Sequence, residues 1–161
     1  MACPPPTIPV MDKSWILFDP DTGLHVSWYF WLRVLDEVNR SARYGDPFAL
    51  LLLETTAHGG EQRCSLEDAA ATVPAAIRST DLGGLVGPGR VGVILTHQPA
   101  TSAVMAAGRI VEQLASRPHG LRWESRLLCY PDDSAEISHL LTAGWGAHRD
   151  RDLDSAVQQP A

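Results

Sequence analysis

The sequence predicts an α+β fold, in which helices pack in layers on a sheet. The chain has 161 residues, a length that suits one domain with one sizeable core. Hydrophobic residues make up 45 % and charged residues 20 %, the balance of an ordinary globular protein. Helical and strand-like patterns follow one another without the strict strand–helix–strand repeat of a parallel Rossmann sheet, so a mixed α+β architecture is favoured.

The first half of the chain predicts a helix, a buried strand and a second helix. Residues 27–45 have apolar residues at helical spacing, a basic end and a closing glycine, which is typical of a helix. Residues 48–56 form a continuous apolar run and predict a central strand that is buried on both faces. Residues 65–81 predict a helix that begins at a Ser65 cap and is kinked or broken by Pro74.

The second half predicts a hairpin, a helix, a strand and a last helix. Residues 84–96 contain two short apolar strands around a Gly-rich turn, and we expect both strands to be central ones. Residues 99–117 predict a helix with Pro99 in its first turn. Residues 121–131 predict a strand, and residues 133–149 a final helix that two glycines weaken.

Both ends of the chain are expected to lie outside the domain. Residues 1–18 form a Pro-rich lead-in without the pattern of a signal peptide, and residues 150–161 form a polar tail. The predicted domain therefore covers residues 19–149. No apolar stretch is long enough to span a bilayer, so no membrane insertion is expected.

Charge and cysteine content exclude several function classes. The net charge of −6 argues against binding to nucleic acid or to an anionic membrane surface. Three scattered cysteines, Cys3, Cys64 and Cys129, favour a reduced, cytoplasmic protein over a disulfide framework. The six histidines show no metal-ligand spacing, so we expect neither a metal nor another cofactor.

Several short stretches, taken in order, carry a family resemblance. They are "DPDTGL" (19–24), "ARYGDPFALLLLE" (42–54), "VGPGRVGVIL" (86–95), "CYPDD" (129–133) and "LLTAGWGAHR" (140–149). In this order and spacing they resemble the GGDEF domain of diguanylate cyclases, which condense two GTP molecules into cyclic di-GMP. The resemblance implies a central, mostly antiparallel sheet of about five strands flanked by helices.

The resemblance also implies that the catalytic groups of the family are missing. Glu54 takes the position of the carboxylate that ends the first strand, and we interpret it as a solvated strand end. Gly89 or Arg90 takes the position of the hairpin carboxylate, and an arginine cannot ligate Mg²⁺. Residues 55–63 replace the stretch that grips guanine and the phosphates, and they are shorter and lack its Asn and Asp. We therefore expect a degenerate domain that is not an enzyme.

A second site of the family is retained in the sequence. Arg78 and Asp81 form an R-x-x-D motif five residues before the hairpin turn, the spacing of the family's inhibitory product site, and Arg109 has the offset of its further arginine. By resemblance, Arg78 would bind the guanine edge, Asp81 the guanine donors, and Arg109 a phosphate or a purine face. The alternative is an Arg78–Asp81 surface ion pair with a solvated Arg109.

The sequence thus predicts a non-catalytic cyclic di-GMP receptor that acts through ligand-dependent dimerisation or through docking to an unknown protein partner. One alternative is an interaction module that has lost ligand binding as well. A second alternative is a residual cyclase or GTP-binding domain.

Overall fold

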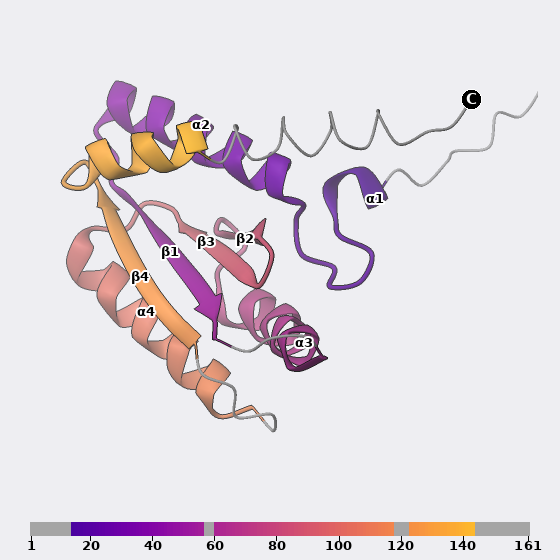
Figure 1. Ribbon diagram of the computed structural model, residues 1–161. Coiled ribbons are helices and arrows are strands. Elements are labelled where there is room, and N and C mark those ends of the chain that lie inside the picture. Colours follow the sequence, from indigo (N-terminus) through magenta and orange to yellow (C-terminus); the bar gives the residue numbers. More distant parts are fainter. Residues whose placement is uncertain (1–13, 57–59, 118–122, 144–161) are drawn as a thin grey trace, which may run out of the picture.

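A four-stranded antiparallel sheet forms the centre of the computed structural model, which describes residues 14–56, 60–117 and 123–143 (Figure 1). The strands are β1 (Phe48–Thr55), β2 (Leu82–Gly87), β3 (Arg90–Leu95) and β4 (Trp123–Tyr130), in the spatial order β2-β3-β1-β4. The helices are α1 (Ser14–Leu17), α2 (Ser27–Tyr44), α3 (Gly60–Ala76) and α4 (Ala100–Ala115), and residues 134–143 are helical as well. The predicted α+β class and the antiparallel sheet are confirmed.

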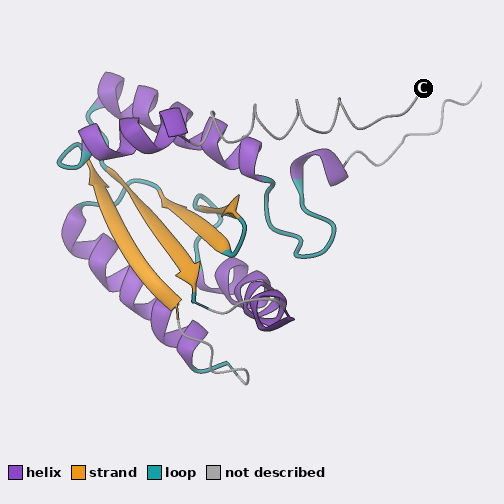
Figure 2. Ribbon diagram, in the orientation of Figure 1, coloured by secondary structure: helices purple, strands orange, loops and turns teal. Residues whose placement is uncertain are grey.

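Helices cover both faces of the sheet, which makes three layers (Figure 2). Helices α3 and α4 pack on one face, where Leu51 and Leu53 of β1 enter the core. Helix α2 and residues 134–143 pack on the other face, where Phe48 and Leu50 are buried. Because successive side chains of a strand point to opposite faces, a strand between two helical layers needs apolar residues at every position. Burial on both faces therefore explains why the apolar run of β1 is uninterrupted.

Two predictions about the sheet are corrected. The described residues form four strands rather than about five. The hairpin was expected to supply two central strands, but β2 lies at the edge and pairs with β3 alone among the described strands. Its composition fits an edge strand, because glycines such as Gly83 and Gly84 offer little side chain for packing.

Helix α3 also differs from its prediction. It begins at Gly60, five residues before the expected start, so Ser65 is not its N-cap. The Ser65 hydroxyl lies inside the helix, where it donates to the Glu61 carbonyl (3.0 Å) and accepts from the Thr55 hydroxyl (3.0 Å). Pro74 is inside the helix, which ends two residues later at Ala76, as expected of a residue that breaks a helix.

Some predicted segments lie outside the described residues. These are residues 1–13 of the lead-in, 57–59 of the stretch 55–63, 121–122 of the strand 121–131, 144–149 of the last helix, and the tail 150–161. Helix α1 falls within the predicted lead-in. Among the helices in the described ranges, none has both the length and the apolar character that crossing a membrane requires.

The edge of β2 is covered by the segment that precedes α2. The backbone of His25 pairs with this edge, since the Leu85 N–H donates to the His25 carbonyl (2.8 Å). The His25 ring stacks on Phe18, with ring centroids 4.4 Å apart. Burial lowers the pKa of His25, so the ring is neutral near pH 7. Covering an edge in this way protects it from pairing with another chain.

The α2 layer is fixed by one aromatic ring that lies over two glycines. Gly84 of β2 and Gly92 of β3 are directly opposite each other, and the buried Phe30 ring occupies the space above them. A Cβ atom at Gly92 would lie 2.3 Å from Phe30 Cζ and 2.6 Å from Val86 Cγ2, and one at Gly84 would lie 2.8 Å from Phe30 Cδ2. Only glycine allows the ring to approach the sheet this closely.

We predict that Gly92→Ala lowers the free energy of unfolding by about 1–3 kcal/mol, because the added methyl forces Phe30 and Val86 out of their positions. The measurement is urea denaturation followed by circular dichroism. Gly108→Ala is the matched control, since a Cβ there meets nothing within 4 Å and the helix gains about 0.5–1 kcal/mol. Equal midpoints for Gly92→Ala and the parent protein would contradict this account of the packing.

Candidate functional site

The structure gathers the three predicted site residues around the C-terminal end of α3. Arg78 follows two residues after the last residue of this helix, and Asp81 directly precedes β2. Arg109 extends from α4, and its Nη2 donates to the carbonyl of Ala76 (3.0 Å). Residues from the α3–β2 connection and from α4 therefore meet in space, although they are separated by about thirty positions in sequence.

The carboxylate of Asp81 organises the backbone of this site. Its Oδ2 accepts from the Arg78 N–H (3.0 Å), and its Oδ1 accepts from the Thr96 N–H (3.0 Å). The Thr96 hydroxyl shares its one hydrogen between Asp81 Oδ1 (3.3 Å) and the Thr80 carbonyl (3.2 Å). The Asp81 N–H in turn donates to the Arg78 carbonyl (3.1 Å). A carboxylate has about four acceptor positions, so these three bonds leave one for a ligand. Asp81 thus closes the turn on which Arg78 is placed.

The guanidinium of Arg78 is available to a ligand. Its side chain is exposed, and no carboxylate of the described residues forms an ion pair with it. The simple Arg78–Asp81 ion pair is not formed, because the carboxylate contacts the Arg78 backbone instead. The R-x-x-D motif therefore presents the positive charge of Arg78 on a turn whose backbone is held by Asp81, and Arg78 has no ion-pair partner among the described residues.

Arg109 adds a second cation next to the same helix end. Its bond to Ala76 places the positive charge where the carbonyls of α3 carry a partial negative charge, which is a favourable position for it. A guanidinium has five N–H donors, and this bond uses one of them. Arg109 is exposed, so its remaining donors can reach an anion or an acceptor edge.

We predict that Asp81→Ala lowers the free energy of unfolding by roughly 1–3 kcal/mol, because the Thr96 and Arg78 amides lose their acceptor. Thermal or urea unfolding measures this loss. Asp81→Asn retains an acceptor oxygen and should recover part of the stability. If Asp81→Ala were as stable as the parent protein, the turn would not depend on this carboxylate.

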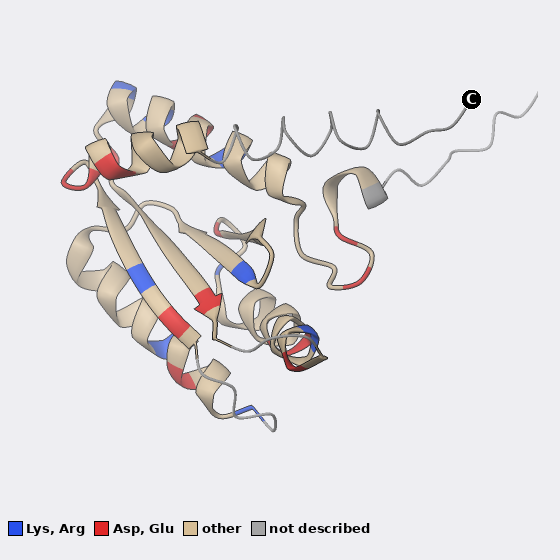
Figure 3. Cartoon of the chain, viewed as in Figure 1, with Lys and Arg blue, Asp and Glu red and all other residues tan. Residues whose placement is uncertain are grey.

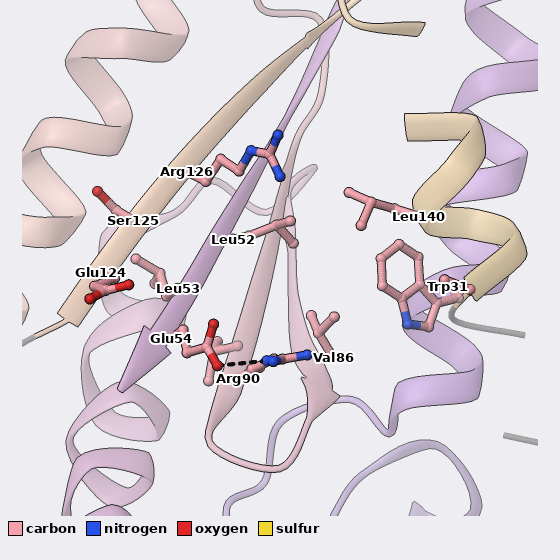
Figure 4. A pocket seen from close by; sticks show the side chains of 12 residues that line it. Trp31, Leu52, Leu53, Glu54, Val86, Arg90, Glu124, Ser125, Arg126 and Leu140 are labelled. Carbon is pink, nitrogen blue, oxygen red and sulfur yellow. Dashed lines mark hydrogen bonds and ion pairs between the residues drawn. The ribbon is translucent and has the colours of Figure 1, made fainter. Parts of the chain in front are cut away.

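A different environment surrounds Glu54, the residue at the family's first metal position. Arg90 lies directly opposite it on β3, and Arg90 Nε donates to Glu54 Oε1 (2.9 Å; Figure 4). Glu124 lies opposite Glu54 on the other side, on β4. Glu54 is exposed, as expected, but it is held in an ion pair rather than solvated alone.

The tip of the hairpin offers no side chain to a metal ion. Pro88 and Gly89 form the turn, and Gly89 has φ +65°, which favours glycine. The amide of Gln62 fills the space of a side chain at position 89, since a Cβ there would lie 2.1 Å from Gln62 Nε2. No three His, Cys, Asp or Glu side chains gather into a metal-binding group in the described parts of the chain. These residues do not fit a site for two divalent ions.

Sequence reasoning missed two partners of the candidate site. Thr96 supplies two of the hydrogen bonds to Asp81, and the Ala76 carbonyl fixes Arg109. Thr96 belongs to no recognisable sequence motif, and its proximity to Asp81 follows only from the pairing of β2 with β3. A backbone carbonyl has no sequence signal at all. The structure brings Arg78, Asp81 and Arg109 to the end of α3, but the contacts that hold them there could be read only from the fold.

The charges of the described elements are interspersed. Figure 3 shows that the basic residues are few and lie apart, with acidic residues among them.

Comparisons with known proteins identify the fold. No family model matches the sequence, and no curated protein matches it. Among solved structures, the coiled coil and GGDEF domain of DgcB from Caulobacter crescentus, in complex with c-di-GMP, has a TM-score of 0.70 at 12% identity, over 86% of this chain and 83% of that one. A DGC protein from Thermotoga maritima has a TM-score of 0.65 at 18% identity, over 78% and 98%.

A third structure contains a protein partner. The diguanylate cyclase SiaD from Pseudomonas aeruginosa, in complex with its activator SiaC, has a TM-score of 0.61 at 16% identity, over 84% of this chain and 60% of that one. At these identities the similarity concerns the fold. The structural neighbours of this chain are GGDEF domains, and its α+β architecture is the fold of those domains.

Proposed function

We propose that this chain is a non-catalytic domain that binds cyclic di-GMP. The observation that carries the proposal is the exposed Arg78 guanidinium, which has no ion-pair partner among the described residues and lies on a turn closed by Asp81. Arg109 is held at the end of α3, two residues before Arg78 in the sequence, by the Ala76 carbonyl. DgcB, which has a similar fold, was solved in complex with c-di-GMP.

The chemistry of the ligand suits these groups. Guanine presents O6 and N7 as two adjacent acceptors, and a guanidinium fork such as that of Arg78 can donate to both. The remaining acceptor position of Asp81 can take a guanine N–H. Arg109 can pair with a phosphate or stack on a purine face. Arg78 and Arg109 form no ion pair among the described residues, and two such cations also favour a ligand that carries two negative charges.

The non-catalytic part of the proposal rests on the hairpin. Cyclisation of GTP requires carboxylates that hold divalent ions on the triphosphate. In this chain, the carboxylate of Glu54 is paired with Arg90, and Gly89 brings no side chain to the tip of the hairpin. The proposed binding of the product does not use the tip of the hairpin, because Arg78 lies before the first hairpin strand and Arg109 contacts the end of α3.

We predict that the purified protein forms no cyclic di-GMP from GTP in the presence of Mg²⁺ or Mn²⁺. The measurement is chromatography of the nucleotides after prolonged incubation. Accumulation of product above a control without protein would show that the chain retains cyclase activity, and the non-catalytic proposal would then be wrong.

We predict that Arg78→Ala weakens cyclic di-GMP binding by roughly tenfold or more, since losing a charged hydrogen-bond partner costs on the order of 1.5–3 kcal/mol. Arg109→Ala should also weaken binding measurably. Isothermal titration calorimetry gives the affinities, and circular dichroism verifies that each variant is folded. Light scattering in the same samples tests whether the ligand joins two copies of the chain.

Arg43→Ala is the matched control, because Arg43 begins an R-x-x-D motif at the exposed end of α2. It should leave the affinity unchanged. Arg33 starts another such motif, but its Nη2 lies 4.0 Å from the buried Glu37, so it is a less neutral choice. Equal binding by Arg78→Ala and the parent protein would mean that the spacing of the motif is a coincidence.

One observation favours a second candidate, an interaction module that binds no nucleotide. Val104 and Met105 are adjacent on α4 and are 60% and 77% exposed, so together they present apolar surface to the solvent. Absence of cyclic di-GMP binding by the parent protein would favour this candidate. SiaD, which has the same fold, was solved with its activator SiaC.

A further inference from the structure

A cavity of about 560 Å³ lies between the sheet and the helical layer of α2 and residues 134–143. Figure 4 shows apolar side chains on its walls: Leu52 from β1, Val86 from β2, and Trp31 and Leu140 from the helices. Its volume is typical of sites for small molecules, which are mostly apolar with a few polar groups. This cavity is distinct from the region of Arg78 and Arg109, neither of which lines it.

The cavity wall contains a polar group without a partner. Trp31 is only 4% exposed, and no described residue accepts a hydrogen bond from its indole Nε1–H. In Figure 4 the nitrogen edge of the ring is turned toward the strands, on the side of Val86 and Arg90. A buried N–H without an acceptor is unfavourable, and an acceptor brought by a ligand would remove this cost. The nitrogen is shielded from water, so binding requires a shift of wall side chains, as is common when ligands bind.

Charged side chains also line the cavity, and they argue against an anionic ligand. Arg90 is paired with Glu54, and Arg126 is paired with Glu136 of the helical residues 134–143. Glu124 also lines the cavity and has no ion-pair partner among the described residues. These ion pairs neutralise the charges of Arg90 and Arg126, and the remaining charge at the cavity is the negative charge of Glu124. An anion would gain no free cation and would be repelled by Glu124.

We propose that this cavity binds an uncharged amphiphile, a molecule with an apolar body and a carbonyl or ether oxygen that accepts from Trp31 Nε1–H. The apolar body lies between Leu52, Val86 and Leu140, and the oxygen faces the indole. This ligand class differs from the nucleotide of the proposed function, and the proposal does not depend on cyclic di-GMP binding.

The test uses the full chain and the fluorescent probe N-phenyl-1-naphthylamine, which is uncharged and apolar. We expect the probe to gain fluorescence on binding. Ethyl octanoate, an uncharged ester, should displace it at concentrations at least tenfold lower than the octanoate anion does. Trp31→Phe should weaken the binding of the ester by about two- to tenfold, which corresponds to the loss of one hydrogen bond. The affinity of the probe should change little.

A wall variant and an NMR signal complete the test. Val86→Glu places a charge in the wall and should abolish probe binding, whereas Val104→Glu on the exposed face of α4 should leave it unchanged. The Trp31 indole N–H resonance, identified by its loss in Trp31→Phe, should move downfield when the ester is added. This signal remains informative if Val86→Glu fails to fold.

Several results would overturn the proposal. Equal displacement by ester and anion would remove the charge argument, and an unmoved Trp31 resonance at saturating ester would remove the anchoring role of its N–H. Absence of probe binding by the parent protein would exclude the apolar site itself. None of these results bears on the titration with cyclic di-GMP, so the two proposals fail separately.

Discussion

The packing of Phe30 on the glycine pair Gly84–Gly92 is the contact on which the rest of the structure depends. It sets the distance between α2 and the hairpin, because a methyl group on Gly92 would lie 2.3 Å from the ring. Strand β2 has glycines at three of its six positions and provides few side chains for its own packing. An edge strand of this composition is held by its neighbours: by β3 through the ladder, by Phe30 from above, and by the His25 backbone at its free edge.

The hairpin has two ends with separate roles. At its base, Asp81 precedes β2 and Thr96 follows β3, so the Asp81–Thr96 hydrogen bond extends the strand pairing that begins at Leu82 and Ile94. Arg78 is attached to this base, which is why its turn is well defined. At the tip, Pro88 and Gly89 form a turn that ends in the Arg90–Glu54 ion pair. Because six residues of strand separate base from tip, side chains at the tip can change without disturbing the turn of Arg78.

Sequence patterns predicted the elements whose residues carry their own signal. The apolar run of β1 reflects burial on both of its faces, and the helical spacing of apolar residues in α2 reflects burial on one face. Both elements were found within one or two residues of their predicted bounds. The errors have a common cause in tertiary structure. Ser65 resembled a helix cap, but its hydroxyl bonds to Thr55 of β1 inside a longer helix. The edge position of β2 and the link between Asp81 and Thr96 depend on strand order, which local sequence does not specify.

The charge arrangement at the hairpin tip explains why an arginine suits this position. Glu54 and Glu124 lie opposite each other on adjacent strands, and like charges in that position destabilise a sheet. A positive charge close to the two carboxylates relieves this repulsion. In this chain, Arg90 lies opposite Glu54 on its other side and supplies a covalently attached cation, with Nε 2.9 Å from the carboxylate. An arginine at position 90 therefore stabilises the sheet and balances the charge of Glu54, which also lines the cavity beside Trp31.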